Sequence, residues 1–302
     1  MKYYSLKQVE QNQRFIQKKG QRSLFGESRH ITTPNGSMEA LCYLDKAKST
    51  DYVVVEVHGG GFMYNTARDD DDFCAYIHNR LKLPVIACDY HCAPQFKYPA
   101  GMQDISACIQ HVRREWGLSE KHIIIWGHSA GANLTSGAAF WDKEEKVFSI
   151  GLQILDYPYM DTYLKANERK RICQSVSGKL MDTFAHYYTE EENVRNPLVS
   201  PVLSETALLR QMPETYLLLC GKDNLNEGGK RYGQLLKNAG VKVEVCYEKE
   251  ALHGFIENHF NYEQIPFTTK IQNTHTQRDL AVYHTDKICS WIQSKISTAA
   301  SS

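Results

Sequence analysis

The segment His122–Phe140, HIIIWGHSAGANLTSGAAF, decides the fold class. An apolar run ends at Gly127, and Gly-His-Ser-Ala-Gly then leads into a helical pattern of small residues. A G-x-S-x-G sequence between a strand and a helix is typical of a nucleophile elbow, a tight turn that exposes the serine hydroxyl. A plain Gly/Ser turn would explain the pentapeptide alone, but not its place between these two patterns. The segment predicts that Ser129 is a nucleophile at the end of a buried strand.

A second glycine-rich segment, Tyr52–Phe62, has the sequence YVVVEVHGGGF. Three consecutive glycines after an apolar run expose backbone N–H groups, and such groups stabilise the negative oxygen that forms when a carbonyl is attacked. A phosphate-binding loop would need G-x-x-x-x-G-K-[ST] or G-x-G-x-x-G, and neither pattern occurs in this segment. The segment therefore predicts an oxyanion-binding loop, with an ordinary flexible loop as the alternative.

The base that activates the serine is expected late in the chain, after a strand. His253 fits this position, because it lies in a loop between the apolar run Val241–Tyr247 and Gly254. The remaining histidines after this run lie in a polar segment or on the final helical pattern: His259, His275 and His284. We therefore predict that His253 is the base.

The acid that orients the base should lie between serine and histidine, at the carboxyl end of a strand. Asp223 meets this condition, because it follows the apolar run Thr215–Cys220 and precedes a helical pattern. Its structural alternative is an N-cap of the helix that begins near Glu227. Asp156, which also ends an apolar run, is the second candidate.

The composition excludes several classes of protein. The chain has 302 residues, of which 42% are hydrophobic and 23% charged, as in an ordinary soluble globular protein. Thirty-five basic and 35 acidic residues cancel, so no overall field would gather nucleic acid or an anionic membrane. No apolar run approaches the roughly 18 residues that a membrane-spanning helix needs. We expect a small-molecule substrate, and neither a nucleic-acid nor a membrane partner.

The cysteines and the N-terminal segment bear on location and metal binding. The segment MKYYSLKQVEQNQRF lacks the apolar core of a signal peptide. Nine cysteines are scattered without a CxxC pair, and an odd number without an export signal favours reduced thiols in the cytoplasm. We expect no cofactor and no metal; a metal site at His91 and Cys92 is a minor alternative.

Strand-like runs alternate with helical patterns along the chain. The predicted strands are Met38–Leu44, Tyr52–Val57, Pro84–Asp89, His122–Gly127, Ile150–Asp156, Thr215–Cys220 and Val241–Tyr247. The predicted helices are Asp71–Lys82, Pro99–Trp116, Ala130–Trp141, Glu227–Ala239 and Asp279–Ile296. This alternation predicts a mostly parallel central sheet with helices on both faces. Residues 1–302 are expected to form one domain, with a small cap at about residues 1–29 and 161–200.

These motifs together resemble the hormone-sensitive lipase-like family of esterases, the HGGG-bearing branch of the α/β hydrolases. The resemblance runs from about Val53 to Phe255. Its further motifs are DYHCAPQFKYPAGMQD at Asp89–Asp104, SP at Ser200–Pro201, DNL at Asp223–Leu225, YGQLLKNAGV at Tyr232–Val241 and HGF at His253–Phe255. It implies the α/β-hydrolase fold and an oxyanion hole formed by Gly60, Gly61 and Ala130. Three neighbouring residues are candidates for substrate contact: His58, Phe62 and His128.

The sequence departs from the family pattern at several positions. His128 stands before the nucleophile, where an acidic residue is usual. His91 and Gln95 replace an arginine and a glutamate, so we expect that an ion pair bracing this loop is absent. The paired acids after the catalytic aspartate are reduced to Glu227, which Gly228 follows. These changes affect the shape of the pocket and its pH behaviour rather than the catalytic residues.

The resemblance implies a serine carboxylesterase that acts on small esters with short acyl chains, and an acetylated sugar is one candidate substrate. Two alternatives remain: an amidase or arylformamidase with the same triad, and a ligand-binding protein of this fold without activity.

The strand Val241–Tyr247 alternates Val241, Val243 and Val245 with more polar residues, which predicts one buried and one wetter face. As the last strand it is expected at the sheet edge, where it would pair with a second copy to form a homodimer.

Overall fold

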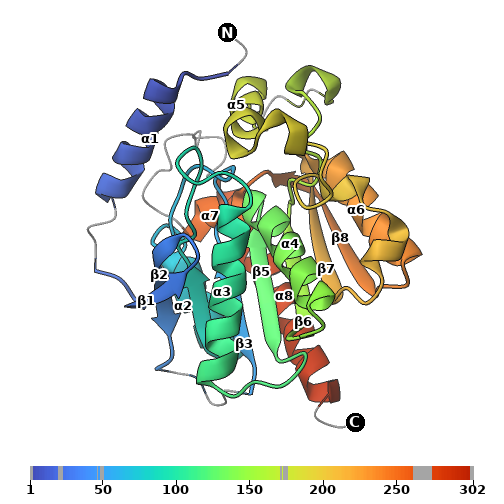
Figure 1. Cartoon of the computed structure of the whole chain (residues 1–302). Coiled ribbons are helices and arrows are strands. Elements are labelled where there is room, and N and C mark those ends of the chain that lie inside the picture. Colours follow the sequence, from blue (N-terminus) through green and yellow to red (C-terminus); the bar gives the residue numbers. More distant parts are fainter. Residues whose placement is uncertain are drawn as a thin grey trace.

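The computed structural model describes residues 3–19, 23–45, 47, 51–170, 172, 176–260 and 274–299. In this part of the chain eight strands form one sheet in the order β1-β2-β4-β3-β5-β6-β7-β8 (Figure 1). All neighbours from β4 to β8 are parallel, whereas β2 pairs antiparallel with both β1 and β4. The bounds are β1 (Glu27–Thr33), β2 (Gly36–Tyr43), β3 (Val53–Val57), β4 (Val85–Cys88), β5 (Ile123–His128), β6 (Ile150–Asp156), β7 (Glu214–Lys222) and β8 (Val243–Leu252).

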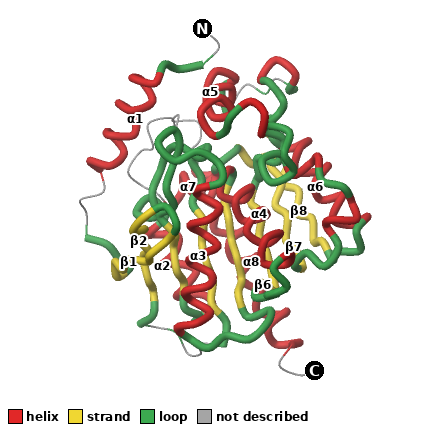
Figure 2. The backbone as a smooth tube through the Cα atoms, viewed as in Figure 1, coloured by secondary structure: helices red, strands yellow, loops and turns green. Residues whose placement is uncertain are grey.

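Helices cover both faces of the sheet (Figure 2). Along β3, Val53, Val55 and Val57 pack into a core with α3, α4 and α6, whereas Val54 packs into a second core with α2 and α8. The α-helices are α1 (Leu6–Lys19), α2 (Asp71–Leu81), α3 (Ala100–Glu115), α4 (Ala130–Glu144), α5 (Gly178–Tyr188), α6 (Asn226–Asn238), α7 (Phe255–Phe260) and α8 (His275–Ala299). Short 3₁₀ turns lie at Ala166–Glu168, Glu191–Asn193, Pro201–Leu203 and Thr206–Leu209. The predicted sheet with helices on both faces is confirmed.

The two segments expected to form a cap meet beyond the ends of the strands. Figure 1 shows α1 and α5 at the top of the view. The Tyr4 N–H donates to Thr183 Oγ1 at 2.9 Å, and the Tyr187 hydroxyl donates to the Tyr4 carbonyl at 3.2 Å. The Gln13 side-chain amide donates to the carbonyl of Met63, in the loop after β3. The N-terminal segment therefore joins α5 to the glycine-rich loop.

Two sequence predictions about strands need correction. The predicted N-terminal cap segment reached residue 29, but β1 begins at Glu27 and pairs with β2. The predicted faces of the last strand hold only in part: Val241 and Val243 pack against the core, but Val245 is 41% exposed and Cys246, on the opposite face, only 8%. The reason is α8, whose His284 covers the face that bears Cys246. The position of β8 at the sheet edge is confirmed.

None of the helices in the described ranges is long and apolar enough to span a membrane.

Candidate active site

Ser129 lies at a sharp turn between β5 and α4. Its backbone angles are φ 52° and ψ −112°, a conformation that L-residues rarely adopt. The turn is held from β6, because the Ser129 N–H donates to the Asp156 carbonyl at 2.9 Å and the Tyr159 N–H donates to the Ser129 carbonyl at 3.1 Å. A Cβ at Gly131 would overlap the carbonyl oxygens of Val57 and His58, so this position needs glycine. The turn aims the hydroxyl beyond the carboxyl end of the sheet.

The structure brings the three predicted catalytic side chains together. His253 Nε2 lies 2.9 Å from Ser129 Oγ, and His253 Nδ1 lies 2.8 Å from Asp223 Oδ2. Asp223 and His253 follow β7 and β8, so neighbouring strands present both residues at one edge. The Leu225 N–H donates to Asp223 Oδ1 at 3.0 Å and fixes the carboxylate. Burial lowers the pKa of His253, but the charge and hydrogen bond of Asp223 outweigh burial and raise it.

The glycine-rich loop presents free backbone donors beside the serine. Gly60 and Gly61 have φ values of 104° and 65°, which favour glycine. Among the described residues neither of their N–H groups has a hydrogen-bond partner, whereas the Gly59 N–H donates to Glu257 Oε1 at 3.1 Å. Ala130 is the first residue of α4, so its N–H lacks an acceptor within the helix. This arrangement fits the predicted oxyanion hole, and Glu257 is a support that the sequence did not reveal.

The second candidate for the acid, Asp156, has a different partner. Its Oδ2 accepts from Trp126 Nε1 at 2.6 Å and lies 3.2 Å from His128 Nδ1. Burial alone would lower the pKa of His128, but the hydrogen bond and charge of Asp156, with the charges of Glu257 and Asp70, raise it to about 9. The contact with Asp156 therefore favours the protonated form of His128 beneath the elbow, with Asp156 as its counter-ion.

The residues predicted to contact substrate lie inside the protein. His58 and His128 are 0% exposed and Phe62 is 1% exposed. The His58 ring stacks on Tyr90 with centroids 4.2 Å apart, and Phe62 stacks on Tyr188 at 3.7 Å. These side chains are buried by the protein itself, so their contacts support the conformation of the loop and the elbow rather than touch a ligand.

A cluster of buried carboxyl groups lies next to His128. Ligand-type atoms of Glu56, Asp70 and His128 lie within 4.8 Å of one another, and all three side chains are buried. This spacing would suit a divalent cation, yet protons also balance the charge: burial raises the pKa of Asp70 to about 8 and raises that of Glu56 too.

His91 and Cys92 are not part of this group. His91 Nδ1 lies 2.8 Å from Asp104 Oδ2, so Asp104 replaces the expected partner in bracing the loop.

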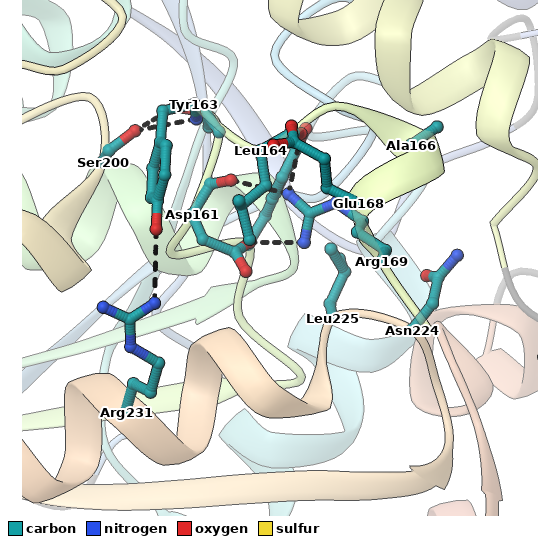
Figure 3. A network of polar contacts seen from close by, with 12 residues as sticks. Asp161, Tyr163, Leu164, Ala166, Glu168, Arg169, Ser200, Asn224, Leu225 and Arg231 are labelled. Atoms are coloured by element: carbon teal, nitrogen blue, oxygen red, sulfur yellow. Dashed lines mark hydrogen bonds and ion pairs between the residues drawn. The ribbon is translucent and has the colours of Figure 1, made fainter. Parts of the chain in front are cut away.

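The second cap segment is anchored at the start of α6, next to the loop that carries Asp223 (Figure 3). Arg169 donates to the Asp161 carboxylate at 2.7 Å and to the Asp161 carbonyl at 2.6 Å, and both side chains are buried. A Cβ at Gly228 would lie 2.7 Å from the Asp161 carboxylate, so glycine there lets the ion pair pack directly on α6. In the family pattern a second acid stands at the position of Gly228. Here the carboxylate of Asp161, from the cap, lies directly beside that position.

Fold and site define a class: an α/β protein with a serine, a histidine and an aspartate in contact in series at the carboxyl edge of a mostly parallel sheet. A family model described as alpha/beta hydrolase fold matches residues 54–257, and the chain belongs to this family. The resemblance inferred from the motifs is confirmed.

Several relatives are named as esterases. Esterase LipI of Mycobacterium tuberculosis is 29% identical over 209 residues, which cover 68% of this chain and 65% of LipI. The chain thus spans just under two thirds of that relative's length. The arylesterase of Saccharolobus solfataricus is 24% identical, with 76% of this chain and 78% of that protein covered. Among solved structures, the carboxylesterase EstE1 from a metagenomic library superposes with a TM-score of 0.76 at 24% identity, over 95% of both chains, which shows the shared fold.

Proposed function

We propose that this protein is a serine carboxylesterase that hydrolyses small esters through an acyl-enzyme on Ser129. The carrying observation is the continuous chain of contacts from Ser129 Oγ to His253 at 2.9 Å and from His253 to Asp223 at 2.8 Å. A serine is a weak nucleophile at neutral pH, and an adjacent oriented base is what activates it. The esterase names of the relatives support the same reaction class.

The proposed mechanism has two half-reactions. In the first, His253 Nε2 takes the proton as Ser129 Oγ attacks the ester carbonyl, and Asp223 holds the imidazole in the tautomer that this transfer needs. The N–H groups of Gly60, Gly61 and Ala130 stabilise the negative carbonyl oxygen. The alcohol leaves with the proton from His253. In the second half-reaction water attacks the acyl group, again with His253 as base, and releases the acid.

The raised pKa of His253 is consistent with this role. The imidazole becomes an imidazolium in each half-reaction, and buried Asp223 stabilises that charge. Since the neutral form is the base, the proposed activity declines as pH falls through the pKa of His253.

The preference for short acyl chains rests on the cap. The Phe184 ring of α5 packs against Gly61 so closely that a Cβ there would overlap it. Tyr188, on the same helix, stacks on Phe62 of the same loop. Aromatic side chains that close directly over the oxyanion loop restrict the space on that side of the serine. Acetyl esters, including acetylated sugars, are therefore the first substrates to test.

One set of substrates separates the proposed function from its two alternatives. A p-nitrophenyl ester series from acetate to decanoate should be hydrolysed, fastest at the short end, while matching anilides should turn over far more slowly. Faster cleavage of the anilides, or of an N-formyl arylamine, would favour an amidase or arylformamidase. No turnover of either series would favour a binding protein.

Two single variants provide the matched controls. Ser129→Ala and Asp223→Asn should each lower kcat by about 10³-fold or more. An aryl phosphonate should add covalently to the wild type and not to Ser129→Ala, as read by intact-protein mass spectrometry. If Asp223→Asn keeps normal turnover and Asp156→Asn does not, the acid role belongs to Asp156.

A further inference from the structure

A second group of nucleophile, base and acid lies at the far edge of the sheet, between β8 and α8. Cys246 Sγ lies 3.6 Å from His284 Nδ1, and His284 Nε2 lies 3.2 Å from Glu248 Oε2. Cys246 and Glu248 are two residues apart on β8, so both side chains face α8. The contacts run from sulfur through imidazole to carboxylate, in the same order as those of Ser129, His253 and Asp223.

Further groups around the sulfur favour its negative form. Lys287 Nζ lies 3.5 Å from Cys246 Sγ and comes from the next turn of α8. The Tyr216 hydroxyl, which is buried on β7, also lies beside the sulfur. The groups that face Cys246 from the packed elements are thus an imidazole, an ammonium and a hydroxyl, and Glu248 binds the far side of the imidazole. A thiolate is favoured where cationic and hydrogen-bonding groups surround it.

The other described cysteines lie in different surroundings. All are free, and burial is a cause of the raised pKa of the Cys74, Cys88, Cys220 and Cys289 thiols. Burial would also raise the pKa of Cys246, but the contacts with His284 and Tyr216 and the charge of Lys287 outweigh burial and lower it. The contacts with Cys246 and Glu248 in turn raise the pKa of His284.

We infer that Cys246 is a peroxide-reactive thiolate, a modification site separate from Ser129. Cys246 is 8% exposed, which admits a reagent about the size of water and excludes a bulky one. In the reaction the thiolate attacks one oxygen of hydrogen peroxide, so an S–O bond forms and the O–O bond breaks. The departing hydroxide takes the Nδ1 proton of the His284 imidazolium and leaves as water. Sulfur is oxidised to sulfenic acid and the peroxide is reduced.

The test is site-resolved labelling of the folded full-length chain. The folded protein is treated with hydrogen peroxide, the peroxide is removed, and the protein is then unfolded in dimedone, which traps sulfenic acid. The adduct at each cysteine is measured by peptide mass spectrometry. Cys246 should be labelled at least about tenfold faster than Cys289, a buried cysteine of α8 without these partners. Glutathione disulfide, a bulkier oxidant, should modify Cys246 far more slowly. Equal labelling of Cys246 and Cys289 would overturn the inference.

Two variants test the role of the neighbours. His284→Asn should slow the labelling of Cys246 about tenfold, because the asparagine supplies neither a positive charge nor a proton. Glu248→Gln changes a side chain that is 23% exposed, so it tests the same relay with less risk to folding. It should also slow labelling, and its alkylation by iodoacetamide should need a higher pH. Wild-type labelling rates in folded Glu248→Gln and His284→Asn proteins would refute the assignment.

Discussion

Gly131→Ala tests how closely the elbow and the oxyanion loop depend on each other. The added Cβ would lie closer than 3.0 Å to three backbone atoms, namely the carbonyl oxygen of Val57 and the carbonyl carbon and oxygen of His58. Backbone atoms cannot rotate away, so either α4 or the end of β3 must shift by about 1 Å. Such overpacking costs about 1–3 kcal/mol, which exceeds the roughly 1 kcal/mol that alanine gains over glycine within a helix.

The same shift should lower activity more than stability. Only Gly59 separates His58 from Gly60 and Gly61, so a displaced β3 end moves the oxyanion donors relative to Ser129. A misplacement of about 1 Å costs roughly 10²-fold in rate. We therefore expect a kcat on p-nitrophenyl acetate reduced about 10²-fold, with a net loss of about 1 kcal/mol in the free energy of unfolding from urea titration, once the helix gain is subtracted from the overpacking cost.

The matched control is Gly137→Ala, six residues further along α4. Its Cβ would meet only the flexible end of the Met102 side chain, which can adopt another rotamer. This variant should keep normal kcat and change stability by less than about 1 kcal/mol, since alanine also favours the helix. If Gly131→Ala behaves like Gly137→Ala in both assays, the contact between α4 and β3 does not position the oxyanion donors.

Three further predictions concern pH and assembly. Because Asp223 raises the pKa of His253, the acid limb of a kcat/KM profile should have a midpoint above about 6.5, and a midpoint well below this value would contradict the assignment. His128→Gln should lower stability by about 3 kcal/mol at pH 6, because Asp156 then lacks its cation. The folded-state pKa of His128 is raised, so the stability that its charge contributes is complete below pH 6.5 and is lost as the pH rises through about 9. The difference in unfolding free energy between wild type and His128→Gln, measured with urea, should therefore be smaller at pH 10 than at pH 6. An equal difference at both pH values would count against a titrating His128. Light scattering at micromolar concentration should show a homodimer that Val243→Pro weakens, and a mass of one chain would exclude it.

The sequence predicted the sheet and the three central side chains because both depend on local patterns. Buried parallel strands appear as apolar runs, and Ser129 stands in a turn that needs its glycines. The strand β1 was missed because ESRHITT is polar and mostly exposed, and only its pairing with β2 defines it. The burial of Cys246 was missed because α8, far along the chain, covers that part of β8.

The buried charges beneath the elbow were also missed, although one signal was present. Glu56 interrupts the apolar run VVVEV and is 0% exposed, so a charged residue within a buried strand indicated a buried partner. Asp70 gave no such signal, because it lies in the run RDDDD, which suggests a solvated surface. Its burial depends on how the loop before α2 packs against β3 and β5, and this packing cannot be predicted from the local sequence.

The backbone conformation at Ser129 lowers the stability of the folded protein. A non-glycine residue with φ of 52° and ψ of −112° carries strain of about 1–3 kcal/mol. Glycine would relieve that strain, so a Ser129→Gly chain is expected to fold more stably while it lacks the nucleophile. A chain under selection for stability alone would therefore lose the serine, and only selection for turnover keeps it in place. Binding proteins that retain this fold without the reaction would arise along that path.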